Sequence, residues 1–242
     1  MFLRLVVFAL LLNTPSVVLA TSSSERWSLA LFGGIVTDKQ DDLNSLITRA
    51  NTRVGGISTP QFTNAYEIGA YIQRRITGSI VAIQVRPGYF FNSTTGTGGS
   101  GSAAGTYSYK VNGYSVMPLI KLYVLESKTV KLFIQSGIGW GTLAGEIQEA
   151  GATSKFSGNN FGFQGGVGVD WCFGSKSQHC LITEGNMRYM SIERNMVSET
   201  SGTFGSNSVS QTARGKELEI DSHDLATTMS GIQAIVGYKF AF

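Results

Sequence analysis

Eight stretches of this sequence alternate, residue by residue, between apolar side chains and small or polar ones. In the clearest stretch, "FGFQGGVGVDWCF", aromatic and Val side chains recur at every second position, with mostly Gly, Gln, Asp and Cys between them. Successive side chains of a β-strand point to opposite faces, so a period of two predicts strands with one apolar and one small, polar face. The stretches are residues 27–35, 65–74, 80–91, 114–125, 130–140, 161–173, 181–192 and 232–242.

The connections between these stretches alternate in length. Three are short, namely residues 75–79, 126–129 and 174–179. Four are long, namely residues 37–64, 92–108, 144–159 and 195–224. An even number of strands of about 9–11 residues, joined by turns on one side and loops on the other, is typical of barrels that cross a membrane. The sequence therefore predicts an all-β fold, an eight-stranded antiparallel up-and-down transmembrane β-barrel with short periplasmic turns, long extracellular loops and periplasmic termini.

Composition agrees with this class. Charged residues make up 14% of the chain, well below the average of about 25%. The net charge of +3 carries no basic block, so we expect no nucleic-acid partner. A soluble, secreted β-sandwich is the alternative fold.

The first twenty residues read as an export signal. Arg4 precedes an apolar run over residues 5–12, and the segment ends in Val-Leu-Ala. That run is too short to span a bilayer, and a small residue at its end fits a cleavage site. We expect residues 1–20 to be a signal peptide cleaved after Ala20, and residues 21–242 to form one barrel domain in the outer membrane.

The chain ends in "GYKFAF", with Gly237, Phe240 and the terminal Phe242. This ending resembles the C-terminal assembly signal of bacterial outer-membrane barrels. Over residues 27–242 the pattern resembles the small eight-stranded barrels of the OmpA, OmpX and OmpW type. The resemblance implies that the barrel-insertion machinery recognises the last strand, which then pairs with the first. We also expect outer-membrane lipid and lipopolysaccharide as surroundings, and a monomer.

The face predicted to point inward carries charges of both signs. An eight-stranded barrel has an interior just wide enough for side chains to fill it, and buried charges must be paired. We therefore expect a sealed core of ion pairs; the alternative is a narrow polar path. The residues are Glu67, Arg86, Lys121, Lys131, Asp170, Glu184, Arg188 and Lys239.

Two cysteines flank the third short turn. Cys172 and Cys180 both have inward parity on neighbouring strands, which favours a disulfide in an oxidising compartment. A metal site with His179 would lack ligands. We expect no metal and no cofactor.

Two prolines interrupt the predicted strands. Pro87 and Pro118 each lack a backbone donor, so we expect a bulge or widened pairing there, unless one strand begins later.

Three loop motifs bear on function. Residues 41–51, "DDLNSLITRAN", have apolar side chains at helical spacing behind Asp41, a residue suited to capping, and predict a short helix. "GTGGSG" matches a dinucleotide-binding string without the strand and helix that would support it, so we read it as a surface loop. "DSHD" contains His223, the one catalytic candidate.

These observations favour a non-enzymatic barrel whose loops serve adhesion or interaction with an extracellular partner, above a largely sealed polar interior. The alternative is a small porin-like conduit for small or amphipathic solutes. A surface hydrolase that uses His223 is a third hypothesis.

Overall fold

We describe the protein from a computed structural model that covers residues 27–53, 55–174, 177–204, 209, 212–220 and 223–242. The predicted signal peptide lies outside the described residues. The long strands are β1 (Trp27–Thr37), β2 (Asn64–Arg75), β3 (Val81–Gly98), β4 (Gly105–Glu126), β5 (Val130–Glu149), β6 (Ala152–Phe173), β7 (His179–Tyr189) and β13 (Gly231–Ala241). The shorter elements are α2 (Asp41–Arg53), η1 (Gly101–Ala103), β8 (Ser191–Ile192), β9 (Met196–Ser201), β10 (Glu219–Ile220), β11 (His223–Asp224) and β12 (Thr227–Thr228).

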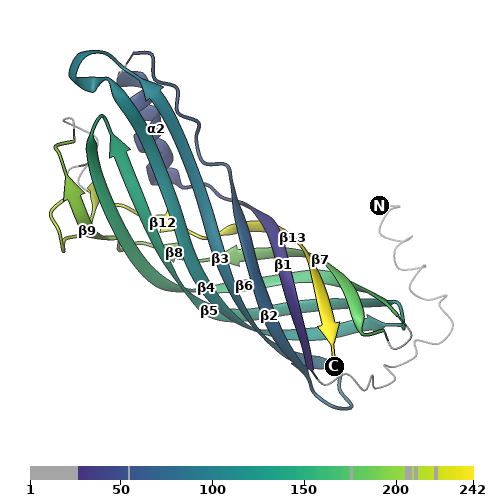
Figure 1. The fold of residues 1–242 in the computed structure, drawn as a ribbon. Helices are drawn as coiled ribbons and strands as arrows, with labels where there is room; N and C mark the ends of the chain where they lie inside the picture. Colours follow the sequence, from purple (N-terminus) through teal and green to yellow (C-terminus); the bar gives the residue numbers. More distant parts are fainter. Residues whose placement is uncertain (1–26, 54, 175–176, 205–208, 210–211, 221–222) are drawn as a thin grey trace, which may run out of the picture.

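The eight long strands close into one antiparallel ring. Each pairs with its neighbours in the chain, β6 pairs with both β5 and β7, and β13 lies between β7 and β1. The last residue completes the seam, because the Phe242 amide donates to the Trp27 carbonyl at 2.9 Å. The terminal aromatic strand therefore pairs with the first strand, and the eight-stranded barrel is confirmed (Figure 1).

The outer surface of the ring is apolar and exposed, as the alternation predicts. On β6, Val167 is 58% exposed while the inward Gln164 is 2% exposed. Exposed aromatic rings gather toward both ends of this surface, and such an apolar band with aromatic girdles is typical of a barrel in a bilayer. Toward the extracellular end they are Tyr66, Phe91, Tyr114, Trp140, Phe161, Phe163 and Tyr189; toward the periplasmic end they are Trp27, Trp171, Phe173, Tyr238, Phe240 and Phe242.

Two of the four predicted long loops are wrong. Residues 92–108 and 144–159 mostly continue the strands, so that β3 and β4 stay paired as far as Gly98 and Gly105, and β5 and β6 as far as Glu149 and Ala152. The loop over residues 195–224 adds β9, which pairs with the extension of β6. In Figure 1, β3–β6 extend far beyond the other strands. The extended strands still bury one face. Their many Gly, Ser, Thr and Asn residues are typical of turns, and for that reason the sequence predicted loops there.

The two prolines cause no bulge. The register between β3 and β4 is continuous through both, with Pro87 opposite Val116 and Pro118 opposite Val85. The pairing is interrupted on the other side of each proline, toward β2 for Pro87 and toward β5 for Pro118, without a change of register. The widened pairing that the sequence predicts is therefore present. Proline has no N–H to donate, and the missing donor of Pro87 would face β2 while that of Pro118 would face β5.

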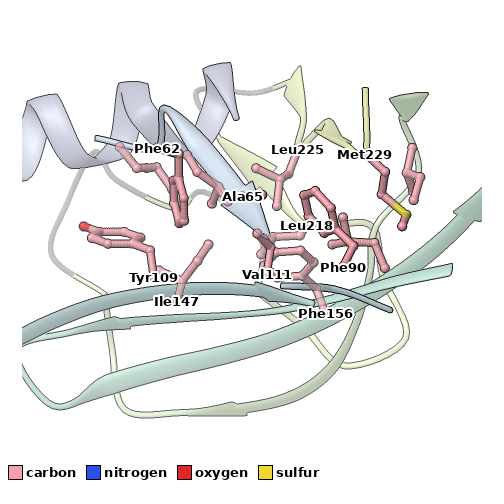
Figure 2. Packing of buried hydrophobic residues seen from close by; sticks show 14 of the residues in the cluster. Phe62, Ala65, Phe90, Tyr109, Val111, Ile147, Phe156, Leu218, Leu225 and Met229 are labelled. Atoms are coloured by element: carbon pink, nitrogen blue, oxygen red, sulfur yellow. The ribbon is translucent and has the colours of Figure 1, made fainter. Parts of the chain in front are cut away.

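The strand extensions, α2 and β8–β12 form a compact extracellular head. The predicted helix is confirmed: α2 buries Leu43, Leu46, Ile47 and Ala50. Figure 2 shows the apolar core of the head. Phe62 and Tyr109 lie below α2, and Leu218, Leu225 and Met229 of the last loop pack into the same core. Across all the described residues, α2 included, none of the helices has the length and apolar character needed to cross a membrane.

Candidate functional site

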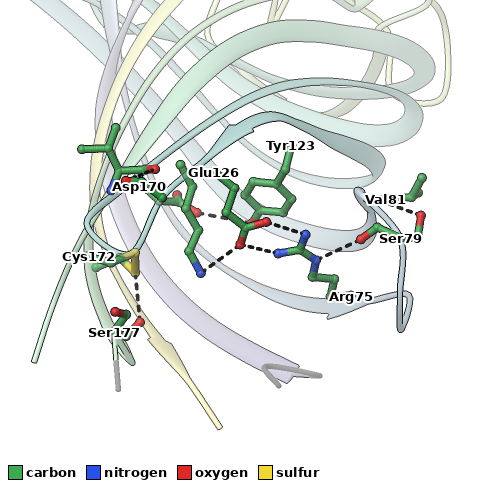
Figure 3. A network of polar contacts seen from close by, with 12 residues as sticks. Arg75, Ser79, Val81, Tyr123, Glu126, Asp170, Cys172 and Ser177 are labelled. Carbon is green, nitrogen blue, oxygen red and sulfur yellow. Dashed lines mark hydrogen bonds and ion pairs between the residues drawn. A yellow bond between two sulfur atoms is a disulfide. The ribbon is translucent and has the colours of Figure 1, made fainter. Parts of the chain in front are cut away.

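The barrel interior is a stack of charged and amide side chains, and its lowest layer lies at the periplasmic end. Arg75 donates to both carboxylate oxygens of Glu126, at 2.6 and 2.7 Å, and to the Ser79 carbonyl at 3.1 Å (Figure 3). Lys131 Nζ lies 3.4 Å from Glu126 Oε1. The Arg75 guanidinium also lies over the Tyr123 ring, 4.9 Å from its centroid. This layer places paired charges at the periplasmic end of the barrel.

The second layer joins Asp170 to Lys239 by an ion pair. The Tyr123 hydroxyl donates to Asp170 Oδ2 at 3.3 Å and accepts from Gln73 Nε2 at 2.9 Å. Lys121 lies beside this layer with its Nζ 3.6 Å from the centroid of the Phe133 ring. An aromatic face attracts a desolvated cation, which offsets part of the cost of burying Lys121.

Glu184 is the centre of the third layer. Its Oε2 accepts from Arg86 Nη2 at 2.6 Å, from Gln135 Nε2 at 2.9 Å and from Asn186 Nδ2 at 3.1 Å. Its other oxygen lies 4.0 Å from Lys121 Nζ, which links this layer to the one below. A buried carboxylate with several donors is the arrangement that burial of charge requires.

The uppermost polar layer pairs Glu67 with Arg188, whose Nη1 lies 2.8 Å from Glu67 Oε2. Gln233 donates to the same oxygen at 2.8 Å, and Arg188 Nε donates to the Met229 carbonyl at 2.6 Å. Met229 belongs to the apolar core of the head. The polar side chains of the barrel interior are therefore in direct contact with the apolar core of the head.

We call these four layers the polar plug. All eight charged residues predicted to line the interior lie in it, and none is more than 5% exposed. The side chains that sequence reasoning missed are Arg75, Glu126, Gln73, Gln135, Asn186 and Gln233; the same inward parity marks most of them.

Cys172 and Cys180 form a disulfide beside the plug. They are opposite each other in the β6–β7 register, with Cα atoms 4.0 Å apart. His179 is engaged elsewhere, since its Nδ1 lies 2.5 Å from the Tyr238 hydroxyl. Among the described residues, no group of three or more His, Cys, Asp and Glu side chains could hold a metal ion.

His223 and the glycine-rich string lie in the head. His223 Nε2 lies 3.7 Å from Asp42 Oδ1, and its side chain is 54% exposed. Within the described part of the chain, no Ser, Thr or Cys side chain hydrogen-bonds to this imidazole. The glycine-rich string, residues 96–101, runs from the end of β3 into η1. Asp221 and Ser222 of the DSHD motif lie outside the described residues. Among the described residues of the two motifs, His223 has only Asp42 within ion-pair distance.

Comparison with protein-family models and with curated proteins finds no match to the sequence. Solved structures do match. OprG of Pseudomonas aeruginosa aligns with a TM-score of 0.52 at 10% identity over 90% of this chain and 97% of its own. A major outer membrane protein of Thermus thermophilus aligns with a TM-score of 0.54 at 9% identity over 90% of this chain and 100% of its own.

The chain has the fold of the small outer-membrane β-barrels. The likeness is one of backbone path, since identities of 9 and 10% leave few side chains in common. The fold therefore identifies the kind of protein.

Proposed function

We propose that this protein is a sealed outer-membrane barrel that holds its extracellular head at the cell surface as a platform for interaction or adhesion. The observation that carries the proposal is the burial of the polar plug. Residues that line a water-filled pore keep accessible surface, whereas Lys121, Asp170 and Arg188 keep almost none. The apolar core of the head covers the plug from outside.

The outer membrane as its location follows from the fold and from the exposed apolar band, which needs lipid around it. The seam between β1 and β13 agrees with recognition of Gly237, Phe240 and Phe242 by the barrel-insertion machinery. Lipopolysaccharide and lipid would surround the band, and a closed ring leaves no sheet edge in the membrane to recruit a second copy. We propose a non-enzymatic monomer.

Planar-bilayer conductance tests the seal. The mature chain, residues 21–242, is refolded in detergent, its folding is verified by a heat-dependent gel shift, and current is recorded across a wide range of salt. We expect the wild type to be silent. A variant with Arg86→Ala, Glu184→Ala and Arg188→Ala removes the centre of the plug and should conduct, whereas the head variant Lys155→Ala with Glu199→Ala should not.

Stable, discrete conductance of the wild type, changed by Arg86→Ala alone, would reject the sealed barrel and support the conduit for small solutes. Silence of all the folded variants would place the seal in the head core rather than in the plug.

A further inference from the structure

A polar groove runs around the start of α2 at the extracellular rim. It consists of two adjoining hollows of about 440 and 530 Å³ that share Lys39 and Asp41. We call their combined lining the rim groove. The first hollow lies between the ends of β1 and β7, the start of α2 and β12. The second follows α2 along residues 44–49 and faces residues 61–63.

The groove offers charged groups that have no ion-pair partner among the described residues. Lys39 and Asp41 are exposed, and among the described residues neither side chain forms an ion pair with another. Asp42 beside them is held, because its Oδ2 accepts from the Ala226 amide at 2.7 Å. The hydrogen-bonded carboxylate of Asp42 and the exposed carboxylate of Asp41 therefore lie close to the exposed ammonium of Lys39.

Hydroxyl and amide side chains line both hollows. They are Thr37, Ser191, Thr228 and Ser230 in the first, and Asn44, Ser45, Thr48 and Gln61 in the second. At the membrane side of the first hollow lies Tyr189, a residue 56% exposed whose ring stacks on Phe163 with centroids 5.6 Å apart. Polar groups that both donate and accept, beside an open aromatic face, suit a ligand that has hydroxyls at its edge and C–H groups on its face.

The groove is already shaped in the structure. The Gln40 amide joins α2 to β12, donating to the Thr228 carbonyl at 2.6 Å and accepting from the Thr228 amide at 3.1 Å. Asn44 fixes the opposite wall through both the amide and the carbonyl of Phe62. A preformed site avoids the cost of ordering its walls on binding.

We propose that the rim groove binds a saccharide, with Asp41 and Lys39 contacting hydroxyls and the Tyr189 ring stacking on one face of a sugar. Two carboxylates against one ammonium disfavour a phosphate in the first hollow. This inference rests on the proposed function, since it gives the platform a ligand. Because Tyr189 belongs to the extracellular aromatic girdle, the sugar can come from a glycolipid headgroup in the same membrane or from a free oligosaccharide.

The test measures binding to the mature barrel in phosphatidylethanolamine nanodiscs with two probes. One is the dephosphorylated core oligosaccharide released from rough lipopolysaccharide, followed by saturation-transfer NMR. The other is intact rough lipopolysaccharide titrated into the nanodiscs, followed by native mass spectrometry. The groove variants are Asp41→Asn, Lys39→Gln and Tyr189→Leu. The matched controls are Glu199→Gln, Lys155→Gln and Phe161→Leu, which lie on the head and the girdle away from the groove.

We expect at least a tenfold rise in Kd for each groove variant and no change for the controls. Loss of both probes in the groove variants shows sugar recognition that is independent of the lipid, and loss of lipopolysaccharide alone shows recognition of the headgroup. Absence of binding to the wild type, or equal binding by groove and control variants, overturns the proposal. If the wild type binds no saccharide but also conducts no current, the saccharide proposal fails while the proposal of a sealed platform stands. The two proposals can therefore fail separately.

Discussion

Arg86 on β3 and Glu184 on β7 are 98 residues apart in the sequence, yet Arg86 Nη2 lies 2.6 Å from Glu184 Oε2 in the centre of the barrel. The pair joins opposite walls of the ring, since β3 and β7 are not neighbours in the sheet. Gln135 and Asn186 donate to the same carboxylate oxygen. The interior is thus held across its width by side chains as well as around its circumference by the backbone.

Replacing Arg86 by Met should lower the free energy of unfolding by about 3 kcal/mol, because it leaves Glu184 buried with less compensating charge. Urea unfolding in detergent, followed by Trp fluorescence, measures the change. The control Lys155→Met removes a partner from the exposed pair with Glu199 and should leave the midpoint unchanged. The double variant Arg86→Met with Glu184→Leu should recover part of the loss; a double variant as unstable as the sum of both single variants would contradict the coupling.

Val167→Lys should destabilise the barrel by about 2–4 kcal/mol, because it places a charge on the lipid-facing surface. Ser157 lies on the same strand and the same outward face, within the head rather than the band. Ser157→Lys should therefore fold as well as the wild type. The folded fraction on a heat-dependent gel, at increasing urea, compares the two. Equal folding of both variants would mean that the band does not face lipid.

Asp38 should make stability depend on pH. It lies just beyond β1, outside the membrane-spanning strand, and burial raises its pKa from 3.8 to about 6 against the opposing hydrogen bonds from Gln40 and Asn92. The folded state then binds this proton more tightly than the unfolded state does. The contribution to stability is complete below pH 3.8 and is lost as the pH rises through about 6.

Asp38→Asn removes that titration, so the variant's urea midpoint should fall less than the wild type's between pH 4 and 7. Other titrating groups affect both proteins equally, which makes the difference between the two curves the relevant quantity. Parallel curves would show that Asp38 is not the titrating group.

Leu46→Ala should loosen the head without opening the barrel. Leu46 is fully buried in the head core, and its truncation costs about 2–5 kcal/mol. Limited proteolysis should cut within α2, while the membrane-embedded strands stay resistant and planar bilayers stay silent. Ser45→Ala changes an exposed residue of the same helix and should remain resistant. Conductance in Leu46→Ala would show that the head, and not the polar plug, seals the interior.

Replacing both Cys172 and Cys180 by Ala should cost about 2 kcal/mol, because the disulfide restricts the unfolded chain around a short loop. The oxidised wild type and the double variant are compared by urea unfolding with and without a reductant. The reductant should lower the wild-type midpoint toward that of the variant and leave the variant unchanged. A midpoint that resists reduction in the wild type would assign the stability of this turn to its strand pairing instead.

The barrel itself could be predicted because a strand between lipid and a side-chain-filled interior has two different solvents on its two faces. The sequence therefore alternates between apolar side chains that face lipid, such as Phe161, Phe163 and Val167, and polar side chains that face inward, such as Gln164. The same parity predicted the inward position of Arg86 and Lys239. It missed Glu126 because this residue ends β4 beside a turn, where alternation no longer separates inside from outside.

Apart from α2, the head could not be predicted, because both faces of its strands avoid lipid. Beyond the membrane the outward positions are mostly Ser, Thr, Asn and charged residues, and with frequent glycines these resemble loops. Tyr109, Ile147 and Phe156 become a core only when α2 and the last loop meet them, and those contacts join segments far apart in the chain.

By itself, the sequence determined the number of barrel strands, the face that most residues of these strands occupy within the membrane and the pairing of the last strand with the first. These follow from a period of two and from closure of the ring. The tertiary structure alone decided which charges pair, since Arg86 meets Glu184, Arg188 meets Glu67 and Lys239 meets Asp170 across a curved wall. It also decided that the barrel is covered by a folded head. Which side chains pair across the barrel depends on strand tilt and side-chain length, and the local pattern of the sequence does not determine how these bring two walls together.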